Sequence, residues 1–335
     1  MKVSFLVTYY NQEQYVKNSI ESILALEKTY DWEILVGDDG SVDRTVEEVN
    51  KYIAVYPDQI QLIVMPRKQD MNYHSVKRVS NSRLTLLEKA TGDFFCVLDG
   101  DDFYIDRTFV KEAIEIFQNN KELSVVAYTY CDYKNGKLGK EISLTKESTG
   151  NVIDTIDYIK ALYVHAGACV FKKTFNCNRI NALKNIGYYD DNDIVINNLC
   201  YGNIFAVNKP VYAYRQTGVS VYTGMNYLEQ AVLNVQGYDV DCSIAPKFAD
   251  NLRYRNREAI IYTFMLRHRI KYLLGNKWSM YFEASQTIPN AIIVKLLDYE
   301  ALDKTQKAQL DGFMLKFMIK NMKTSIKTAI KILKG

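Results

Sequence analysis

Short apolar runs alternate with helically spaced apolar positions over the first 130 residues of the chain. The runs that predict strands are 2–8, 32–36, 60–65 and 94–98. Helices are predicted at 11–26 and at about 74–90, and another is marked by Val46, Val49 and Ile53. Asn11 is placed to cap the first of these helices. Apolar strands separated by helices are typical of βαβ units, so we expect a Rossmann-like, mostly parallel sheet covered on both faces.

The pattern changes after residue 120. Further strands are predicted in a mixed arrangement at 123–130, 168–173, 203–207 and 211–215, and the Asn135-Gly136 pair predicts a tight hairpin turn. From about residue 225 the strand signals fade and helical spacing dominates. We therefore expect two parts, an α/β domain over 1–224 and a helical region over 225–335.

Composition narrows the class of protein. Apolar residues make up 48% of the 335 positions and charged residues 24%, as in ordinary globular proteins. The net charge is only +3 and no Lys/Arg stripe is interleaved with aromatic residues, so no nucleic-acid partner is expected. Six cysteines without a C-x-x-C pair, no signal-peptide pattern and no apolar run of about 18 residues favour the cytoplasm, without a zinc site or a membrane span.

Two acidic loops follow predicted strands, "GDDGSVD" at 37–43 and "DGDD" at 99–102. Ligands of parallel α/β sheets bind outside the carboxyl ends of the strands, so both loops should open onto the same edge. Asp99 and Asp101 are spaced to flank a divalent cation. Such a cation would neutralise the charge of a bound diphosphate. The alternative is a solvated turn with Asp102 capping the next helix. Neither G-x-G-x-x-G nor a P-loop is present.

Three blocks of the sequence resemble the family 2 glycosyltransferases of the GT-A fold. They are "VSFLVTYYNQEQYVKNSIESIL", "WEILVGDDGSVDRT" and "ATGDFFCVLDGDDFY", and the likeness runs from residue 2 to about residue 220. The resemblance implies a GT-A α/β fold, a nucleotide-sugar donor, UDP-sugar by default, and a glycan or lipid-linked glycan acceptor. It also implies transfer with inversion, in bacterial surface polysaccharide synthesis.

The resemblance implies roles for residues on the donor side. Thr8, Tyr9 and Asn11 would lie along the nucleotide pocket, Asp39 would hydrogen-bond the base, and Asp38 would support that loop. Asp99 would contact the ribose or the metal shell, with Gly100 beside it, and Asp101 would be the direct ligand of Mn²⁺ or Mg²⁺. Arg83 would reach the nucleotide, although Leu84 stands where an asparagine is usual.

On the acceptor side, the resemblance extends over 188–215. Asp190-Asp191, Gly202 and Tyr214-Arg215 match the family offsets, and Asp191 would be the general base that deprotonates the acceptor hydroxyl. Asp193 competes for this role, and Asp190 or Asp191 could instead cap the helix. His165 either touches the donor or acceptor or is a satisfied core residue. Arg215 either neutralises phosphate or pairs with a carboxylate of the rim.

Lysines and apolar residues occupy separate arcs of the predicted helix 315–335. Such a basic amphipathic helix is typical of peripheral contact with an anionic membrane, here the inner face of the cell membrane, which we expect. The alternative is a helix that packs its apolar side on its own domain. The segment 226–314 would form either the acceptor groove or a homo-oligomer contact. Two other functions are weighed, a nucleotidyltransferase and a non-catalytic GT-A-like scaffold.

Overall fold

The computed structural model describes residues 1–65, 75–144, 149–187, 189–217, 237, 240–252 and 330. The described residues up to 217 belong to one compact unit, which also includes Ser243–Ala245. A second unit comprises Val219–Cys242 and Pro246–Gly335, and one of its described pieces is the 3-10 helix η2 (Pro246–Phe248). The predicted division at residue 224 and the predicted helix 315–335 lie outside the described residues, apart from residue 330 alone.

The first unit is built from strands and helices that alternate over its first half. Its strands are β1 (Lys2–Tyr9), β2 (Asp31–Asp38), β3 (Ile60–Val64), β4 (Phe94–Asp99), β5 (Phe103–Tyr104), β6 (Leu123–Lys134), β7 (Lys137–Ile142), β8 (Val152–Ile153), β9 (Cys169–Lys172) and β10 (Asn203–Arg215). Its helices are α1 (Glu13–Leu24), α2 (Thr45–Val55), α3 (Ser75–Lys89), α4 (Phe109–Asn119), α5 (Thr155–Ala161), the 3-10 helix η1 (Ala166–Ala168), α6 (Cys177–Ile186) and α7 (Asp191–Leu199).

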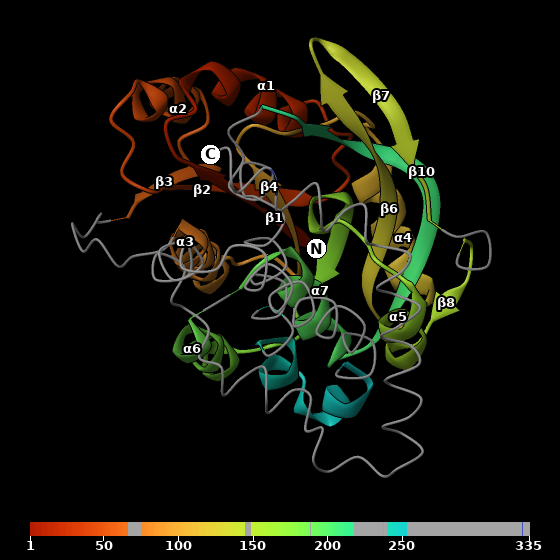
Figure 1. Ribbon diagram of the computed structural model, residues 1–335. Coiled ribbons are helices and arrows are strands. Elements are labelled where there is room, and N and C mark those ends of the chain that lie inside the picture. The colour runs from red at the N-terminus through yellow and green to blue at the C-terminus, as the bar shows by residue number, and fades with distance from the viewer. Residues whose placement is uncertain are drawn as a thin grey trace. The chain divides into compact units, whose positions relative to one another are not determined.

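All described strands form one sheet, in the order β3-β2-β1-β4-β9-β6-β10-β5 (Figure 1). Strands β3, β2, β1 and β4 are mutually parallel. β9 runs antiparallel between β4 and β6, β10 is parallel to β6, and the short strands β5 and β8 are antiparallel to β10. The sequence-based prediction of a parallel first half and a mixed second half is confirmed.

Helices cover both faces of the parallel half of the sheet. Apolar side chains of α1, α2 and α4 join those of the strands in one buried cluster, and α3 and α6 lie on the opposite face (Figure 1). In α1, Val16, Ile20 and Ile23 are fully buried at the spacing of one helical face. Because β1 is covered on both faces, its residues Val3 to Leu6 are buried without alternation.

Some local predictions need correction. Asn11 does not cap α1, since Gln12 occupies the N-cap position and makes no side-chain cap bond. The predicted strands 203–207 and 211–215 are a single strand, β10, whose register with β6 shifts around Pro210. The hairpin turn is confirmed, with Asn135 and Gly136 both at positive φ between β6 and β7.

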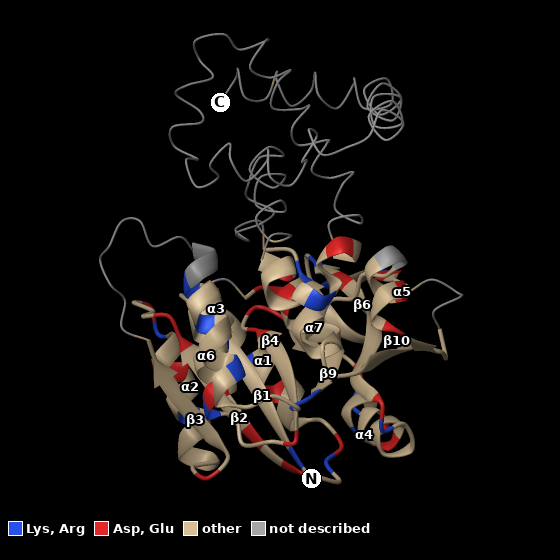
Figure 2. Ribbon diagram, turned by 90° about the horizontal axis from the view of Figure 1, so that it is seen from below, with Lys and Arg blue, Asp and Glu red and all other residues tan. Residues whose placement is uncertain are grey.

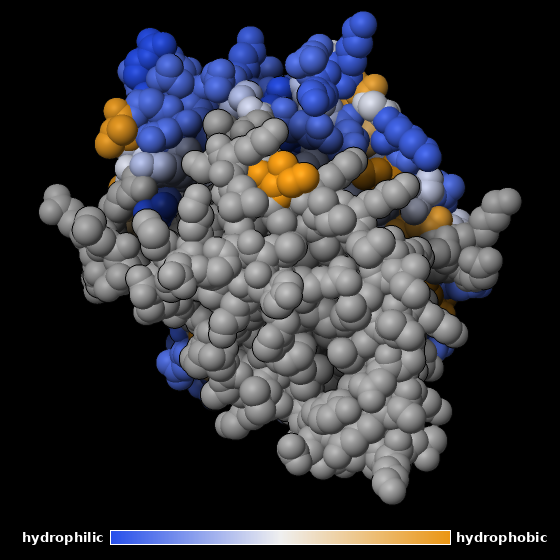
Figure 3. Space-filling view, in the orientation of Figure 1, coloured by the Kyte–Doolittle hydropathy of each residue, from blue (hydrophilic) through white to orange (hydrophobic). Residues whose placement is uncertain are grey.

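The described surface is mainly polar on the face shown in Figure 3, where hydrophilic residues outnumber apolar ones. None of the described helices has the length and apolar content needed to cross a membrane. The six cysteines are all free thiols, and four of them are buried as small core residues.

Candidate active site

The two acidic loops open at one edge of the sheet. In the parallel pairing of β1 with β4, Thr8 lies opposite Asp99. The main chains extend this contact, because the Asp39 N–H donates to the Tyr9 carbonyl (3.0 Å) and the Gly100 N–H to the Thr8 carbonyl (2.9 Å). Acidic and basic positions gather at this edge, near the start of α7 (Figure 2). The expected meeting of both loops at the carboxyl ends of the strands is confirmed.

Asp38 holds the first loop in place. This buried carboxylate accepts from the N–H groups of Gly40 (3.0 Å) and Ser41 (2.9 Å) and from the Ser41 hydroxyl. Asn11 fastens the same loop to the end of β1, because its side-chain oxygen accepts from the Val42 N–H (2.8 Å) and its own N–H donates to the Ser41 hydroxyl (2.9 Å). What Asn11 contributes to this edge is thus the shape of the 38–42 loop.

Asp39 projects from this loop toward Arg78, and the two side chains form an ion pair (3.1 Å). The Arg78 guanidinium also lies over the ring of Tyr10, 5.8 Å from its centroid, and Tyr10 is 37% exposed. A carboxylate beside an open aromatic ring offers both hydrogen bonding and stacking to a flat heterocycle. The sequence analysis did not single out Arg78 or Tyr10. The one signal for Tyr10 is that it directly follows β1, whose carboxyl end lies at this edge of the sheet.

Tyr9 directs its side chain away from this edge and into the core. Its ring is buried, and its hydroxyl bonds to Ser19 (2.5 Å). The ring also explains why position 100 is glycine, since a Cβ there would overlap the Tyr9 ring and lie 2.6 Å from Oε1 of Gln12. Tyr9 therefore presents only its main chain at the edge, and Gly100 allows the acidic loop to approach it closely.

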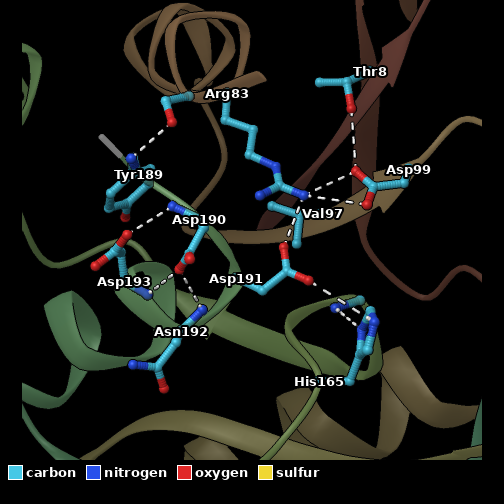
Figure 4. Close-up of polar contacts among 12 residues, drawn as sticks. Thr8, Arg83, Val97, Asp99, His165, Tyr189, Asp190, Asp191, Asn192 and Asp193 are labelled. Carbon is cyan, nitrogen blue, oxygen red and sulfur yellow. Dashed lines mark hydrogen bonds and ion pairs between the residues drawn. The ribbon is translucent and has the colours of Figure 1, made fainter. Parts of the chain in front are cut away.

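Arg83 connects the end of β4 with the start of α7 (Figure 4). Its buried guanidinium donates to both oxygens of Asp99 (2.9 and 3.2 Å) and lies 2.7 Å from Oδ1 of Asp191. Asp99 also accepts from the Thr8 hydroxyl (3.2 Å). Four of the residues singled out from the sequence, Thr8, Arg83, Asp99 and Asp191, therefore form one contiguous polar network.

Arg83 and Asp99 stay ionised because the attraction between opposite charges in the network outweighs the effect of burial on their pKa values. Burial works to lower the pKa of Arg83, but the charges of Asp191 and Asp99 raise it above its ordinary value. Burial works to raise the pKa of Asp99, but the charge and hydrogen bond of Arg83 hold it below its ordinary value. Both groups are therefore ionised at neutral pH, which a buried pair tolerates only with good hydrogen-bond geometry.

The three carboxylates at the start of α7 have separate tasks. Asp190 is the N-cap and accepts from the N–H groups of Asn192 (3.0 Å) and Asp193 (3.1 Å), while the Asp193 carboxylate accepts from the Asp190 N–H (2.8 Å). This reciprocal capping box engages the two carboxylates. Asp191, the first helical residue, points instead toward Arg83 and His165 (Figure 4). The cap is Asp190, and Asp191 is available for chemistry.

His165 is buried on the other side of Asp191. Its Nε2 lies 3.8 Å from Oδ2 of Asp191, and its Nδ1 accepts from the Gly167 N–H (3.1 Å). Burial lowers the pKa of His165, although Asp191 and Asp99 act in the opposite direction. The imidazole packs against three aromatic rings, those of Tyr130, Tyr212 and Tyr214.

Asp101 is a carboxylate whose negative charge its surroundings compensate only in part. Burial and the charge of Asp99 raise its pKa to about 6, while a hydrogen bond from Gln12 and the charge of Arg215 act against the rise. No three His, Cys, Asp or Glu side chains of the described part are grouped to hold a metal. A hard divalent cation can be held by only one or two carboxylates together with phosphate and water oxygens, and the buried Asp101 beside the charge of Asp99 is compatible with that arrangement.

Asp102 and Arg215 join the acidic loop to β10. Asp102 is buried and accepts from the Tyr212 hydroxyl and the Arg215 N–H (2.6 Å), so it does not cap a helix. The Arg215 guanidinium donates to the Asp101 carbonyl and to Asn18 (2.6 Å) and lies over the rings of Tyr15, Phe103 and Tyr133. These contacts position the loop, and the charge of Arg215 also acts on the carboxylate of Asp101, while its predicted role toward a phosphate stays a prediction.

The chain is similar to known proteins in sequence and in fold. Residues 4–176, more than half of the chain, match the profile described as glycosyl transferase family 2. The chain belongs to this family. It is 34% identical over 125 residues to the putative glycosyltransferase EpsE of Bacillus subtilis, and the match covers 37% of this chain and 41% of EpsE.

One longer relative of this family 2 chain is a polymerase. The chain is 25% identical over 227 residues to the teichoic acid poly(glycerol phosphate) polymerase of Staphylococcus epidermidis, covering 63% of this chain and 28% of the polymerase. The chain thus spans less than half the length of either relative. The crystal structure of S. aureus TarS 1-349 in complex with UDP superposes with a TM-score of 0.58 at 14% identity, over 99% of this chain and 89% of that one. This likeness shows the fold, the GT-A α/β fold that was expected.

Proposed function

We propose that this chain is a metal-dependent, inverting glycosyltransferase that moves a hexosyl or N-acetylhexosaminyl group from a nucleotide sugar, with UDP-sugar as the default, to a glycan or lipid-linked glycan acceptor. One observation carries the proposal. The guanidinium of Arg83 joins Asp99, at the donor-side strand end, to Asp191 at the start of α7. A displacement reaction needs a donor-side group and a base at a fixed separation, and this bridge supplies that separation.

The names of similar proteins support the donor and the process. TarS 1-349 has been crystallised with UDP and with UDP-GlcNAc, and its complex with UDP-GlcNAc superposes on this chain with a TM-score of 0.55 at 16% identity. The polymerase of S. epidermidis is named for teichoic acid, and the minor teichoic acid biosynthesis protein GgaA of B. subtilis is 22% identical over 221 residues. We infer a role in the synthesis of a bacterial surface polysaccharide or cell-wall polymer.

The donor side would use the edge formed by β1, β2 and β4. Asp39 would accept from the nucleobase, with Thr8, the Tyr9 main chain and the Asn11-shaped loop lining the pocket, and Asp99 and Gly100 would contact the ribose side. Mn²⁺ or Mg²⁺ held by Asp101, with Asp99 next to it, would stabilise negative charge on the leaving diphosphate. Arg83 fixes the orientation of Asp99 toward this pocket.

The acceptor side would use Asp191 as the general base. Arg83 engages Oδ1 of Asp191, which leaves Oδ2 facing the space beside His165. Oδ2 would take the proton of the acceptor hydroxyl as the oxygen bonds to the anomeric carbon and the bond from that carbon to the diphosphate oxygen breaks. Attack from the face opposite the diphosphate gives a β-linkage from an α-linked donor.

Isothermal titration calorimetry with UDP, with and without Mn²⁺, tests the donor side. We expect binding that strengthens with Mn²⁺; no binding under either condition would overturn the proposal. Asp191→Asn tests the base, since it should retain UDP affinity and lose at least 100-fold in transfer rate. Binding of UDP without turnover by the wild-type chain would support the scaffold alternative instead. The membrane contact of 315–335 and the division at residue 224 remain predictions.

A further inference from the structure

Oδ2 of Asp191 and Nε2 of His165 face each other without a direct hydrogen bond. Oδ2 and Nε2 are 3.8 Å apart, which is too long for a direct hydrogen bond. An oxygen about 2.8 Å from each atom would make an angle of about 85° with them, narrower than the tetrahedral angle at a hydroxyl oxygen but within the range of bent hydrogen bonds. The two side chains are thus spaced to hold a single hydroxyl or water molecule.

The state of His165 is set by its surroundings. The Gly167 N–H donates to Nδ1 (3.1 Å), so a neutral imidazole carries its proton on Nε2, the atom that faces Asp191. The ring is buried, and contacts with Tyr130 and Tyr212 hold its plane (ring centroids 5.0 and 4.8 Å away). Nε2–H is therefore a fixed hydrogen-bond donor beside the Oδ2 acceptor.

We propose that His165 contacts the acceptor hydroxyl and that, with Asp191, it selects and orients that hydroxyl. Nε2–H donates to the hydroxyl oxygen while the hydroxyl donates its own proton to Oδ2 of Asp191. That proton passes to Asp191, the oxygen bonds to the anomeric carbon, the bond to the diphosphate breaks, and His165 keeps its proton throughout. With one lone pair on His165 and the proton on Asp191, the other lone pair is aimed at the donor sugar. This inference rests on the proposed function.

The matched variants His165→Asn and His165→Gln separate this role from a structural one. The amide oxygen of asparagine can replace Nδ1 as the acceptor for Gly167, but asparagine has no atom at the position of Nε2. Glutamine can place an N–H donor near that position and gives up the acceptor for Gly167. A contact with the hydroxyl requires the Nε2 donor, whereas a structural role requires the Nδ1 acceptor.

The assay measures UDP release from UDP-GlcNAc and from UDP-glucose with Mn²⁺, where water takes the place of the acceptor. We expect His165→Asn to lower kcat about 10- to 100-fold with the donor KM unchanged, and His165→Gln to stay within about fivefold of the wild type. If both variants retain the wild-type kcat, or if glutamine is the more damaging replacement, the inference is wrong while the proposed function stands. A wild-type chain that neither binds nor releases UDP overturns both.

Nitrogen-15 NMR of the full-length chain gives a readout that needs no turnover. The chain has three histidines, and the signals lost in His165→Asn assign residue 165. At pH 7 we expect a neutral ring protonated on Nε2. A ring protonated on Nδ1, or an imidazolium, would place no suitable donor beside Asp191 and would overturn the inference even if the chain is active.

Discussion

Replacing Asp101 with asparagine should stabilise the metal-free protein at neutral pH while removing its response to divalent cations. The carboxylate of Asp101 lies close to the charge of Asp99 and is largely removed from water, and both effects raise its pKa to about 6. Above that pH the folded protein holds a charge that its surroundings disfavour. Asparagine is nearly isosteric and keeps a hydrogen-bonding group for Gln12, but it carries no charge.

The magnitude and sign follow from the pKa. A rise from the ordinary 3.8 to about 6 corresponds to about 3 kcal/mol at 1.36 kcal/mol per pH unit. Asp101 keeps some solvent contact, so screening reduces this to about 1–2 kcal/mol. Because the folded pKa lies above the unfolded one, the favourable contribution is complete below about pH 4 and is lost as the pH rises through about 6. The variant should not show that loss.

The assay compares thermal unfolding of wild type and Asp101→Asn from pH 4 to 8 without metal, then with Mn²⁺. We expect equal midpoints near pH 4 and a variant about 2–6 °C more stable at pH 7, with Mn²⁺ raising only the wild type. Asp43→Asn is the control of opposite sign, because the pKa of Asp43 is lowered: burial opposes that shift, but hydrogen bonds from Thr45 and the Glu13 N–H outweigh it. A variant that is less stable than the wild type at pH 7 would refute the reasoning.

Three further substitutions test the framework of the site. Arg83→Met should lower stability by about 3–5 kcal/mol and abolish transfer, because it leaves two carboxylates without their buried partner; urea unfolding and UDP release measure both effects. Gly100→Ala should lower the free energy of unfolding by about 1–3 kcal/mol and weaken UDP binding in calorimetry, because its Cβ would overlap the Tyr9 ring. The control Gly136→Ala, in open space at φ +78°, should lower it by only about 1 kcal/mol in urea and leave UDP binding unchanged. Tyr212→Phe should cost about 1–3 kcal/mol in urea, since Asp102 loses a buried donor; an unchanged midpoint would contradict the structural role of Asp102.

The sequence was informative wherever one local pattern determines the structure. β1 and β4 read as largely apolar runs because they are covered on both faces, and the acidic loop at 99–102 begins where the apolar run of β4 stops. The same burial on both faces removed the information needed to orient Tyr9. Without alternation of apolar and polar residues, nothing in "FLVTYY" shows that Tyr9 enters the core while Tyr10 stays at the surface.

Contacts between distant segments could not be read from spacing. Asp190, Asp191 and Asp193 look alike in sequence, and only the capping box separates the structural pair from the candidate base. Arg83 was expected to reach the nucleotide, and its ion pair with Asp191, more than a hundred positions away, depends on how α3 and α7 pack over the sheet. The tautomer of His165 likewise depends on one N–H, that of Gly167.

The carboxylates of "DGDD" differ because each has a different neighbour. Asp99 is balanced by Arg83. Burial and the charges of Asp101 and Asp99 raise the pKa of Asp102 well above its ordinary value, although the Tyr212 hydroxyl and the Arg215 N–H donate to it and act against the rise. Arg83 also balances Asp191, so a single guanidinium serves two carboxylates. Asp101 is left with one amide donor and a partly compensated charge. A cation bound at this edge would gain most by binding beside Asp101, and so Asp101→Asn should weaken the response to Mn²⁺ more than Asp102→Asn does.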